Sequence, residues 1–149
     1  MTTIFYKIDY SSLANEDAIL KYSKRDLGEM VFIGDILILN ENTKDYLVLK
    51  EISLFRFFYQ CLHALHELKS TNESKFSDPS NYYDIKMRIN KGMLEIKDID
   101  SVQVNYKEFL KEFSIVWKNF IKELELAYPR IINNKKYLEL RQSCFDDLP

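Results

Sequence analysis

The sequence predicts an α+β fold: an antiparallel sheet of about five to six strands, two long helices packed on it and a short C-terminal helix. Three observations predict this class. Apolar segments rich in β-branched residues are joined by short turns, which favours antiparallel pairing. Two longer segments repeat apolar residues at three- and four-residue steps, as amphipathic helices do. The length of 149 residues suits one domain, residues 1–149, with its own core.

The first predicted strands lie in the N-terminal third. Thr3–Asp9 is rich in β-branched and aromatic residues, which favour strands. Met30–Leu39 (MVFIGDILIL) is apolar almost throughout and predicts a buried strand that bends at Gly34 and Asp35. Tyr46–Lys50 follows a polar turn, so the two segments are expected to form a hairpin.

The segment between the first two strands is more polar. Ser11 or Ser12 can cap a short helix that runs to Lys21. Gly28 suits a turn or a stop after that helix. We therefore expect one helix and one turn to join the first strand to the second.

A second group of strands is predicted in the middle of the chain. Ser70–Asn81 has no periodicity and predicts a surface loop. Tyr82–Asn90 and Leu94–Ile99 alternate apolar and polar residues, with Gly92 supplying positive φ in the turn between them. Val102–Asn105 is either a third strand of this meander or the end of the second.

Three helices complete the prediction. Ile52–Lys69 has a wide apolar face and a candidate cap in Ser53. Tyr106–Tyr128 has the clearest helical periodicity, and Pro129 ends it because proline is not tolerated in a helix interior. A short last helix is expected near Asn134–Gln142.

The composition excludes several functional classes. Lys and Arg total 21 against 23 Asp and Glu, a net charge of −2, which is not the balance of a nonspecific nucleic-acid binder. The 3 glycines, Gly28, Gly34 and Gly92, are too scattered for a phosphate-binding loop. Because the chain has no catalytic or cofactor motif, the sequence favours a non-enzymatic protein with no cofactor and no nucleic-acid partner.

The N-terminal segment, the apolar stretches and the cysteines indicate the cellular compartment in which the protein is expected. The start MTTIFYKIDYSS has no basic segment followed by an apolar run, so no secretory signal is expected. The longest apolar stretch, Val31–Leu39, is far shorter than the ~20 residues of a membrane span. Cys61 and Cys144 do not form a disulfide framework, which suits the reducing cytosol. The expected location is the cytoplasm, with no membrane partner.

An aromatic and histidine stripe is the first candidate site. Tyr59, His63 and His66 share one side of the first long helix, beside Phe55 and away from its core face. Aromatic residues carry much of the energy of protein interfaces, so the stripe is a candidate partner-binding surface. The alternatives are that a loop or the N-terminal segment covers the stripe, or that it serves a small ligand- or metal-binding domain or enzyme. A metal site needs more ligands than two histidines, so none is predicted.

Two other surfaces are candidates. Asp98 and Asp100 alternate with Ile99 at a strand end, where they are solvated turn residues or an acidic rim for a basic partner. Ile115 and Leu126 lie on the back of the last long helix. We expect the C-terminal helix to cover this pair. The alternative is that the pair forms the contact of a homo-oligomeric accessory protein.

Four segments together carry a resemblance: MVFIGDILIL, ISLFRFFYQCLHALHEL, YYDIKMRINKGMLEIKDID and VNYKEFLKEFSIVWKNFIKELELAYP. In architecture and texture they resemble the immunity proteins of bacterial polymorphic toxin systems, including contact-dependent growth inhibition. The resemblance implies a cytoplasmic inhibitor that neutralises a cognate toxin domain by tight protein–protein binding. It assigns no functional residues. For the free protein we expect a monomer or a weak homodimer.

Overall fold

The computed structural model describes residues 1–12, 16–30, 32–80 and 82–146, with the side chains of residues 12, 16, 29, 30 and 143–146 outside the description. The chain folds as an α+β protein with two antiparallel sheets, ordered β1-β2-β3 and β4-β5-β6-β7. The strands are β1 (Thr2–Ile8), β2 (Ile33–Asn40), β3 (Tyr46–Ser53), β4 (Glu73–Ser77), β5 (Asp84–Asn90), β6 (Met93–Lys97) and β7 (Ser101–Asn105). The helices are η1 (Tyr10–Ser12), α1 (Glu16–Ile19), α2 (Lys24–Met30), α3 (Leu54–Glu67), α4 (Tyr106–Ala127), η2 (Pro129–Asn133) and α5 (Lys135–Asp146).

The prediction of one sheet is wrong, because β1–β3 and β4–β7 pair only among themselves and form two sheets. The second sheet begins with a strand that the sequence does not predict, β4, which pairs with β5. This strand lies inside the segment predicted as a loop. Its sequence ESKFS carries one large apolar side chain, Phe76, which packs on Phe57 and Tyr83 with ring centroids 5.8 and 6.0 Å apart. Tertiary packing therefore holds a strand that local periodicity does not reveal.

The segment before β2 also differs from the expectation. Two short helices, α1 and α2, replace the single predicted helix, and residues 13–15 of that prediction lie outside the described residues. Gly28 lies inside α2 and not in a turn. Its carbonyl accepts a hydrogen bond from the hydroxyl of Ser53, which also caps α3 by accepting from the backbone N–H of Arg56.

The two long helices form where their sequences predict them. Ser53 caps α3, and Asn105 caps α4 by accepting from the N–H of Glu108 at 3.0 Å. Pro129 follows the end of α4, as expected. The predicted apolar face of α3 is buried throughout: Leu54, Phe57, Phe58, Cys61, Leu62, Leu65 and Leu68.

The core lies where α3 and α4 pack against each other and against both sheets. Phe58 is fully buried, and its ring lies 4.9 Å from Phe120, 5.8 Å from Trp117 and 5.9 Å from Tyr6, measured between centroids. Tyr6 belongs to the first sheet. The preceding residue of α3, Phe57, contacts Phe76 of the second sheet. One core therefore serves both sheets.

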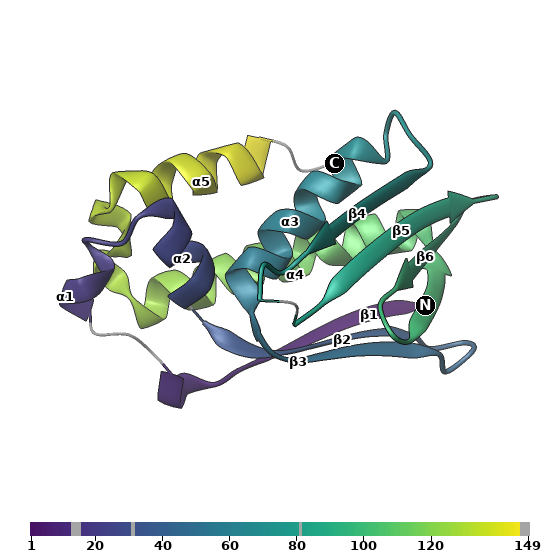
Figure 1. Cartoon of the computed structure of the whole chain (residues 1–149), viewed down its shortest axis with the longest axis horizontal. Helices are drawn as coiled ribbons and strands as arrows, with labels where there is room; N and C mark the ends of the chain where they lie inside the picture. Colours follow the sequence, from purple (N-terminus) through teal and green to yellow (C-terminus); the bar gives the residue numbers. More distant parts are fainter. Residues whose placement is uncertain (13–15, 31, 81, 147–149) are drawn as a thin grey trace.

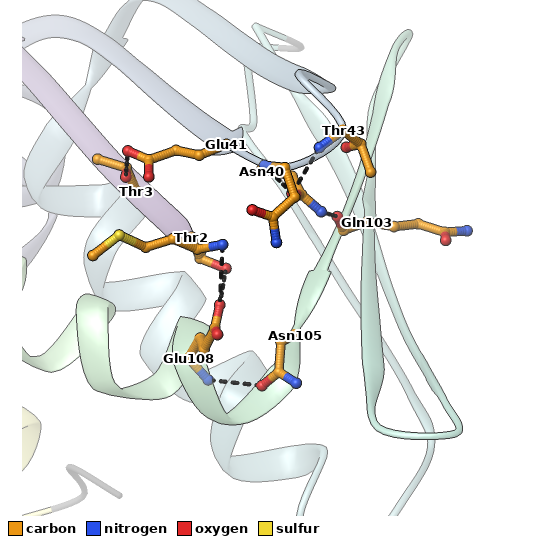
Figure 2. A network of polar contacts seen from close by, with 10 residues as sticks. Thr2, Thr3, Asn40, Glu41, Thr43, Gln103, Asn105 and Glu108 are labelled. Atoms are coloured by element: carbon orange, nitrogen blue, oxygen red, sulfur yellow. Dashed lines mark hydrogen bonds and ion pairs between the residues drawn. The ribbon is translucent and has the colours of Figure 1, made fainter.

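A polar network joins the two sheets and the start of α4 (Figure 2). The side-chain amide of Asn40 at the end of β2 donates to the carbonyl of Gln103 in β7 at 2.7 Å. At the other end of the network the hydroxyl of Thr2 donates to Glu108 at 3.4 Å. Asn40 is 9% exposed, so these bonds form largely out of water and fix the angle between the sheets.

The two sheets differ in what covers them. In Figure 1 all five labelled α-helices lie on the same side of the β1–β2–β3 sheet, which runs along the lower edge of the molecule. The second sheet lies beside α3 and α4, on the side of the molecule where β2 and β3 meet at their hairpin. None of the helices in the described part of the chain combines the length and apolarity needed to cross a membrane.

Candidate functional site

The predicted Tyr59–His63–His66 stripe is only partly a surface. His63 and His66 are exposed, and the ring of Tyr59 is half-buried with its centroid 4.5 Å from that of His63. Phe55, at the other end of the stripe, is buried against Trp117 of α4 and Tyr137 of α5. The C-terminal helix, and not a loop or the N-terminal segment, covers this end.

Tyr59 also lines a cleft of about 310 Å³ between α2, α3 and α5. Phe55 and Leu140 form an apolar part of the cleft, and Lys24, Arg25 and Arg56 give it cationic side chains. Arg56 lies 3.7 Å from the buried carboxylate of Asp78, and Lys24 pairs with Glu139 of α5 at 3.0 Å. Such a cleft suits a small anionic molecule with an apolar body, at the lower limit of ligand-site volumes.

The cysteines and histidines form no reactive centre in the described structure. Cys61 is fully buried, and burial raises the pKa of its thiol well above the usual range, so it is not a thiolate nucleophile. The side chain of Cys144 lies outside the described residues. Across residues 1–12, 16–30, 32–80 and 82–146, no group of three His, Cys, Asp or Glu side chains is placed to hold a metal ion.

The predicted acidic pair lies in the turn between β6 and β7. Asp98 is half-buried, and its carboxylate accepts the backbone N–H of Asp84 at 3.1 Å. Its own N–H donates to the carbonyl of Asp100 at 2.8 Å, and Asp100 is exposed. Asp98 therefore has a structural task, which is to hold the turn against β5. The pair lies on a different element from the α3 stripe.

The apolar pair on the back of α4 is exposed, contrary to the expectation that the C-terminal helix covers it. Ile115 is 48% exposed and Leu126 is 80% exposed. The physical reason is the path of α5, which packs on α2 and α3 and buries Tyr137 and Leu140 there. The pair consists of two separated side chains and does not form a continuous surface.

A continuous apolar surface lies on the outer side of the first sheet. The strand register places Phe5, Leu37 and Val48 side by side across β1, β2 and β3. Leu39 and Tyr46 form the next row, beside Thr3. We call the five residues Phe5, Leu37, Leu39, Tyr46 and Val48 the apolar face. Phe5 is 53% exposed, Tyr46 is 58% and Val48 is 37%.

Polar groups border the apolar face at its other end. Lys7 lies opposite Asp35 in the register of β1 and β2. The carboxylate of Asp35 accepts the backbone N–H of Glu51 at 2.9 Å, where a register irregularity interrupts the pairing of β2 with β3. An apolar centre with a satisfied polar border is the anatomy of a protein-binding surface.

The apolar face is not apparent from the sequence, although β2 carries its signal. Met30–Leu39 predicts a buried strand because nearly every residue is apolar. In the structure Ile36 and Ile38 face the core, whereas Leu37 and Leu39 face outward and are only half-buried. A strand that is apolar on both sides is typical of sheets covered on both faces. In the described part of the chain the helices cover only one face of this sheet, so its second apolar side is exposed to solvent.

Comparison of the chain with protein-family models, with curated proteins and with solved structures found no match.

Proposed function

We propose that the protein is a non-enzymatic, cytoplasmic binding protein that docks on a partner protein through the apolar face and neutralises it. The observation that carries the proposal is the register of apolar residues across all three strands of the first sheet. Singly exposed apolar residues are ordinary, but contiguous ones rimmed by polar groups mark interaction sites. The core side of the sheet is already filled by α3 and α4, so the outer face serves no packing within the described chain.

The apolar face has the properties that make a binding surface strong. Phe5 and Tyr46 are large, rigid aromatic side chains of the kind that act as interface anchors. They stand on a sheet whose opposite side is packed into the core, so little conformational freedom is lost when a partner binds. A standard interface buries about 1,600 Å² in total, and a domain of this size offers that area.

The class of partner follows from the resemblance and from the absence of catalytic chemistry in the sequence. We propose a cognate toxin domain, blocked sterically, as the partner. The free, buried thiol of Cys61 accords with action in the reducing cytosol. The apolar face replaces the α3 stripe and the Asp98–Asp100 turn as the centre of the proposed interface.

A pair of matched variants tests the proposal. Phe5→Lys with Val48→Lys places two charges on the apolar face, and both positions are exposed enough for the fold to accept them. The control, Ile115→Lys with Leu126→Lys, makes the same change on the back of α4. The tagged protein is used to capture partners from a lysate of the organism that encodes it, and the captured domain is then co-expressed with each variant.

The wild type and the α4 control are expected to capture the same domain in stoichiometric amount and to restore growth when that domain is toxic. The face variant is expected to do neither, since a charged anchor in an interface centre costs several kcal/mol. Capture and protection that survive in the face variant would contradict the proposal. A stable homodimer that dissociates in the face variant alone would also contradict it, by making a second copy the occupant.

The cleft beside Tyr59 supports a second candidate function, binding of a small anionic ligand. Its support is the combination of an apolar wall with Lys24, Arg25 and Arg56 in one concavity. Thermal shift measurements with a panel of aromatic carboxylates and nucleoside monophosphates test it. A ligand that raises the melting temperature of the wild type but not of Tyr59→Ala would favour this function.

A further inference from the structure

The outer side of the second sheet carries three lysines in one row. Lys75 lies opposite Lys86 in the pairing of β4 with β5, and Lys86 lies opposite Lys97 in the pairing of β5 with β6. All three are exposed, whereas their strand neighbours Phe76, Ile85, Met87 and Ile96 turn toward the core. We call Lys75, Lys86 and Lys97 the lysine row.

The lysine row is not neutralised within the described chain. Glu73, two residues before Lys75 in β4, binds Arg88 at 3.0 Å, and Glu67 at the end of α3 accepts the hydroxyl of Ser74 at 2.6 Å. None of the three ammonium groups forms an ion pair with a described residue. Like charges placed directly opposite each other in a sheet repel, so this arrangement costs the free protein stability that an anionic partner would restore.

A hollow of about 810 Å³ lies along the lysine row, and it is lined as well by Arg88 and by the carboxylates of Glu67, Glu73 and Glu95. The surface is therefore concave, so a rod-shaped element of a partner would contact more of it than of a flat sheet. Adjacent strands are spaced about 4.8 Å apart. The row runs across the strands, so neighbouring lysines of the row are separated by that spacing.

We propose that the lysine row is a docking site for an acidic α-helix of a partner protein. A helix laid across the strands presents side chains on successive turns every 5.4 Å or so, which nearly matches the strand spacing. Carboxylates near positions i, i+4 and i+7 of such a helix would each meet one lysine. In an extended strand the side chains on one face repeat about every 6.6–6.8 Å. Its third carboxylate would therefore no longer lie opposite the third lysine.

The surroundings of the row favour a protein over a polyphosphate chain. Glu73 and Glu95 border it on one side, and Asp84 borders it on the other, as the strand registers show. A nucleic-acid backbone continues its negative charge beyond three sites and would meet these carboxylates. A protein helix carries charges only at particular positions. Basic or neutral residues beside its acidic stripe can therefore lie against Glu73, Glu95 and Asp84.

A titration with a defined peptide tests the inference. The probe is a helical peptide with Glu at i, i+4 and i+7 on one face, added to ¹⁵N-labelled full-length protein at low salt. Lys75, Lys86 and Lys97 are replaced together by Gln in one variant. In the matched control Lys111, Lys118 and Lys122, three exposed lysines of α4, are replaced by Gln, which removes the same net charge.

We expect amide shifts confined to β4, β5 and β6, with affinity about tenfold weaker in the row variant and unchanged in the control. Equal binding by wild type and row variant overturns the inference, and so do shifts centred elsewhere. Binding of an oligothymidylate on β4–β6, with none of the peptide, overturns it in favour of nucleic acid. Because the lysine row and the apolar face share no residue, failure here is distinct from failure of the proposed docking on the first sheet.

Discussion

The outer faces of the two sheets differ in chemistry although both sheets share one core. On the first sheet the outward residues of three adjacent strands are apolar, with Phe5, Leu37 and Val48 in register. On the second sheet the outward residues are charged, with Lys75, Lys86 and Lys97 in register. A charged outer face is what an antiparallel sheet presents to water. The first sheet departs from that rule, and this departure locates the proposed function there.

The apolar and the charged outer face would contribute to binding in different ways. An apolar surface contributes affinity by releasing water, in proportion to the area buried. A charged row contributes association rate and orientation, and salt weakens it. We therefore expect the apolar face to set how tightly a partner is held and the lysine row to set how it is oriented.

The largest expected effect is on the core that both sheets share. Phe58→Ala removes a ring packed against Tyr6, Trp117 and Phe120 and should destabilise the protein by about 3–5 kcal/mol. Denaturant unfolding followed by both tryptophan fluorescence and far-UV circular dichroism measures this. Phe5→Ala, on the apolar face, is the matched surface control and should cost far less. Two separate unfolding transitions would show that the sheets do not share one core.

The two sheets each contain a glycine whose replacement should destabilise the protein, but for different reasons. A Cβ at Gly34 in the first sheet would lie 2.0 Å from the carbonyl oxygen of Lys7, so β1 and β2 could not keep their spacing. Gly92 in the second sheet has open space but a φ of +78°. Gly34→Ala should cost about 3 kcal/mol through overpacking, and Gly92→Ala about 1–2 kcal/mol through backbone strain. Thermal unfolding of the two variants checks this order, and the reverse order would contradict it.

A smaller, pH-dependent effect concerns the attachment of the first sheet to α4. The hydroxyls of Tyr6 and Tyr10 donate to the two oxygens of Glu123 at 2.6 and 2.9 Å. Burial and this carboxylate raise the pKa of both phenols above the usual value of 10.0. A raised pKa stabilises the fold below the unfolded-state pKa, and this contribution is lost as pH rises above about 10.

Unfolding free energies measured at pH 8 and pH 11 should therefore fall with pH, and Tyr6→Phe should reduce that fall. The exposed Tyr82 provides the control substitution, Tyr82→Phe. Equal pH dependence in wild type and Tyr6→Phe would show that the Tyr6–Glu123 contact does not contribute.

The smallest effect is expected on the second sheet. Lys86→Glu places a carboxylate between Lys75 and Lys97 and converts two repulsive neighbours into attractive ones. The free protein should gain about 0.5–1 kcal/mol, and the gain should shrink at 1 M salt. Lys118→Glu on α4 is the charge-matched control. A loss of stability at low salt in Lys86→Glu would mean that the lysines of the row do not repel one another.

Much of the fold is predictable from the sequence because local signals and packing agree. Apolar periodicity located α3 and α4, and Ser53 and Pro129 marked boundaries that the structure confirms. The division into two sheets was not predictable. It depends on which strands pair, and β1–β3 and β4–β7 pair only among themselves. The residues of β4, ESKFS, have little strand pattern of their own, and Phe76 holds the strand by packing on Phe57 and Tyr83.

The candidate site was less predictable than the fold. Histidines and acidic residues are common candidates for a functional site in a sequence. In the structure His63, His66 and Asp100 are exposed. The apolar face consists of ordinary strand residues, and which side of a strand meets the core is decided by the position of helices far away in the chain. Only the register of three strands shows that Phe5, Leu37 and Val48 form one surface.

Side-chain footprinting of the protein in complex with its captured partner tests whether the apolar face is the interface. Carbene labelling followed by mass spectrometry reports the accessibility of Phe5, Tyr46 and Val48, with Ile115 and Leu126 as internal controls of similar exposure. We expect labelling of the first three residues to fall sharply on complex formation and labelling of the two α4 residues to stay unchanged. Protection of Ile115 and Leu126 with unchanged labelling of the apolar face would contradict it.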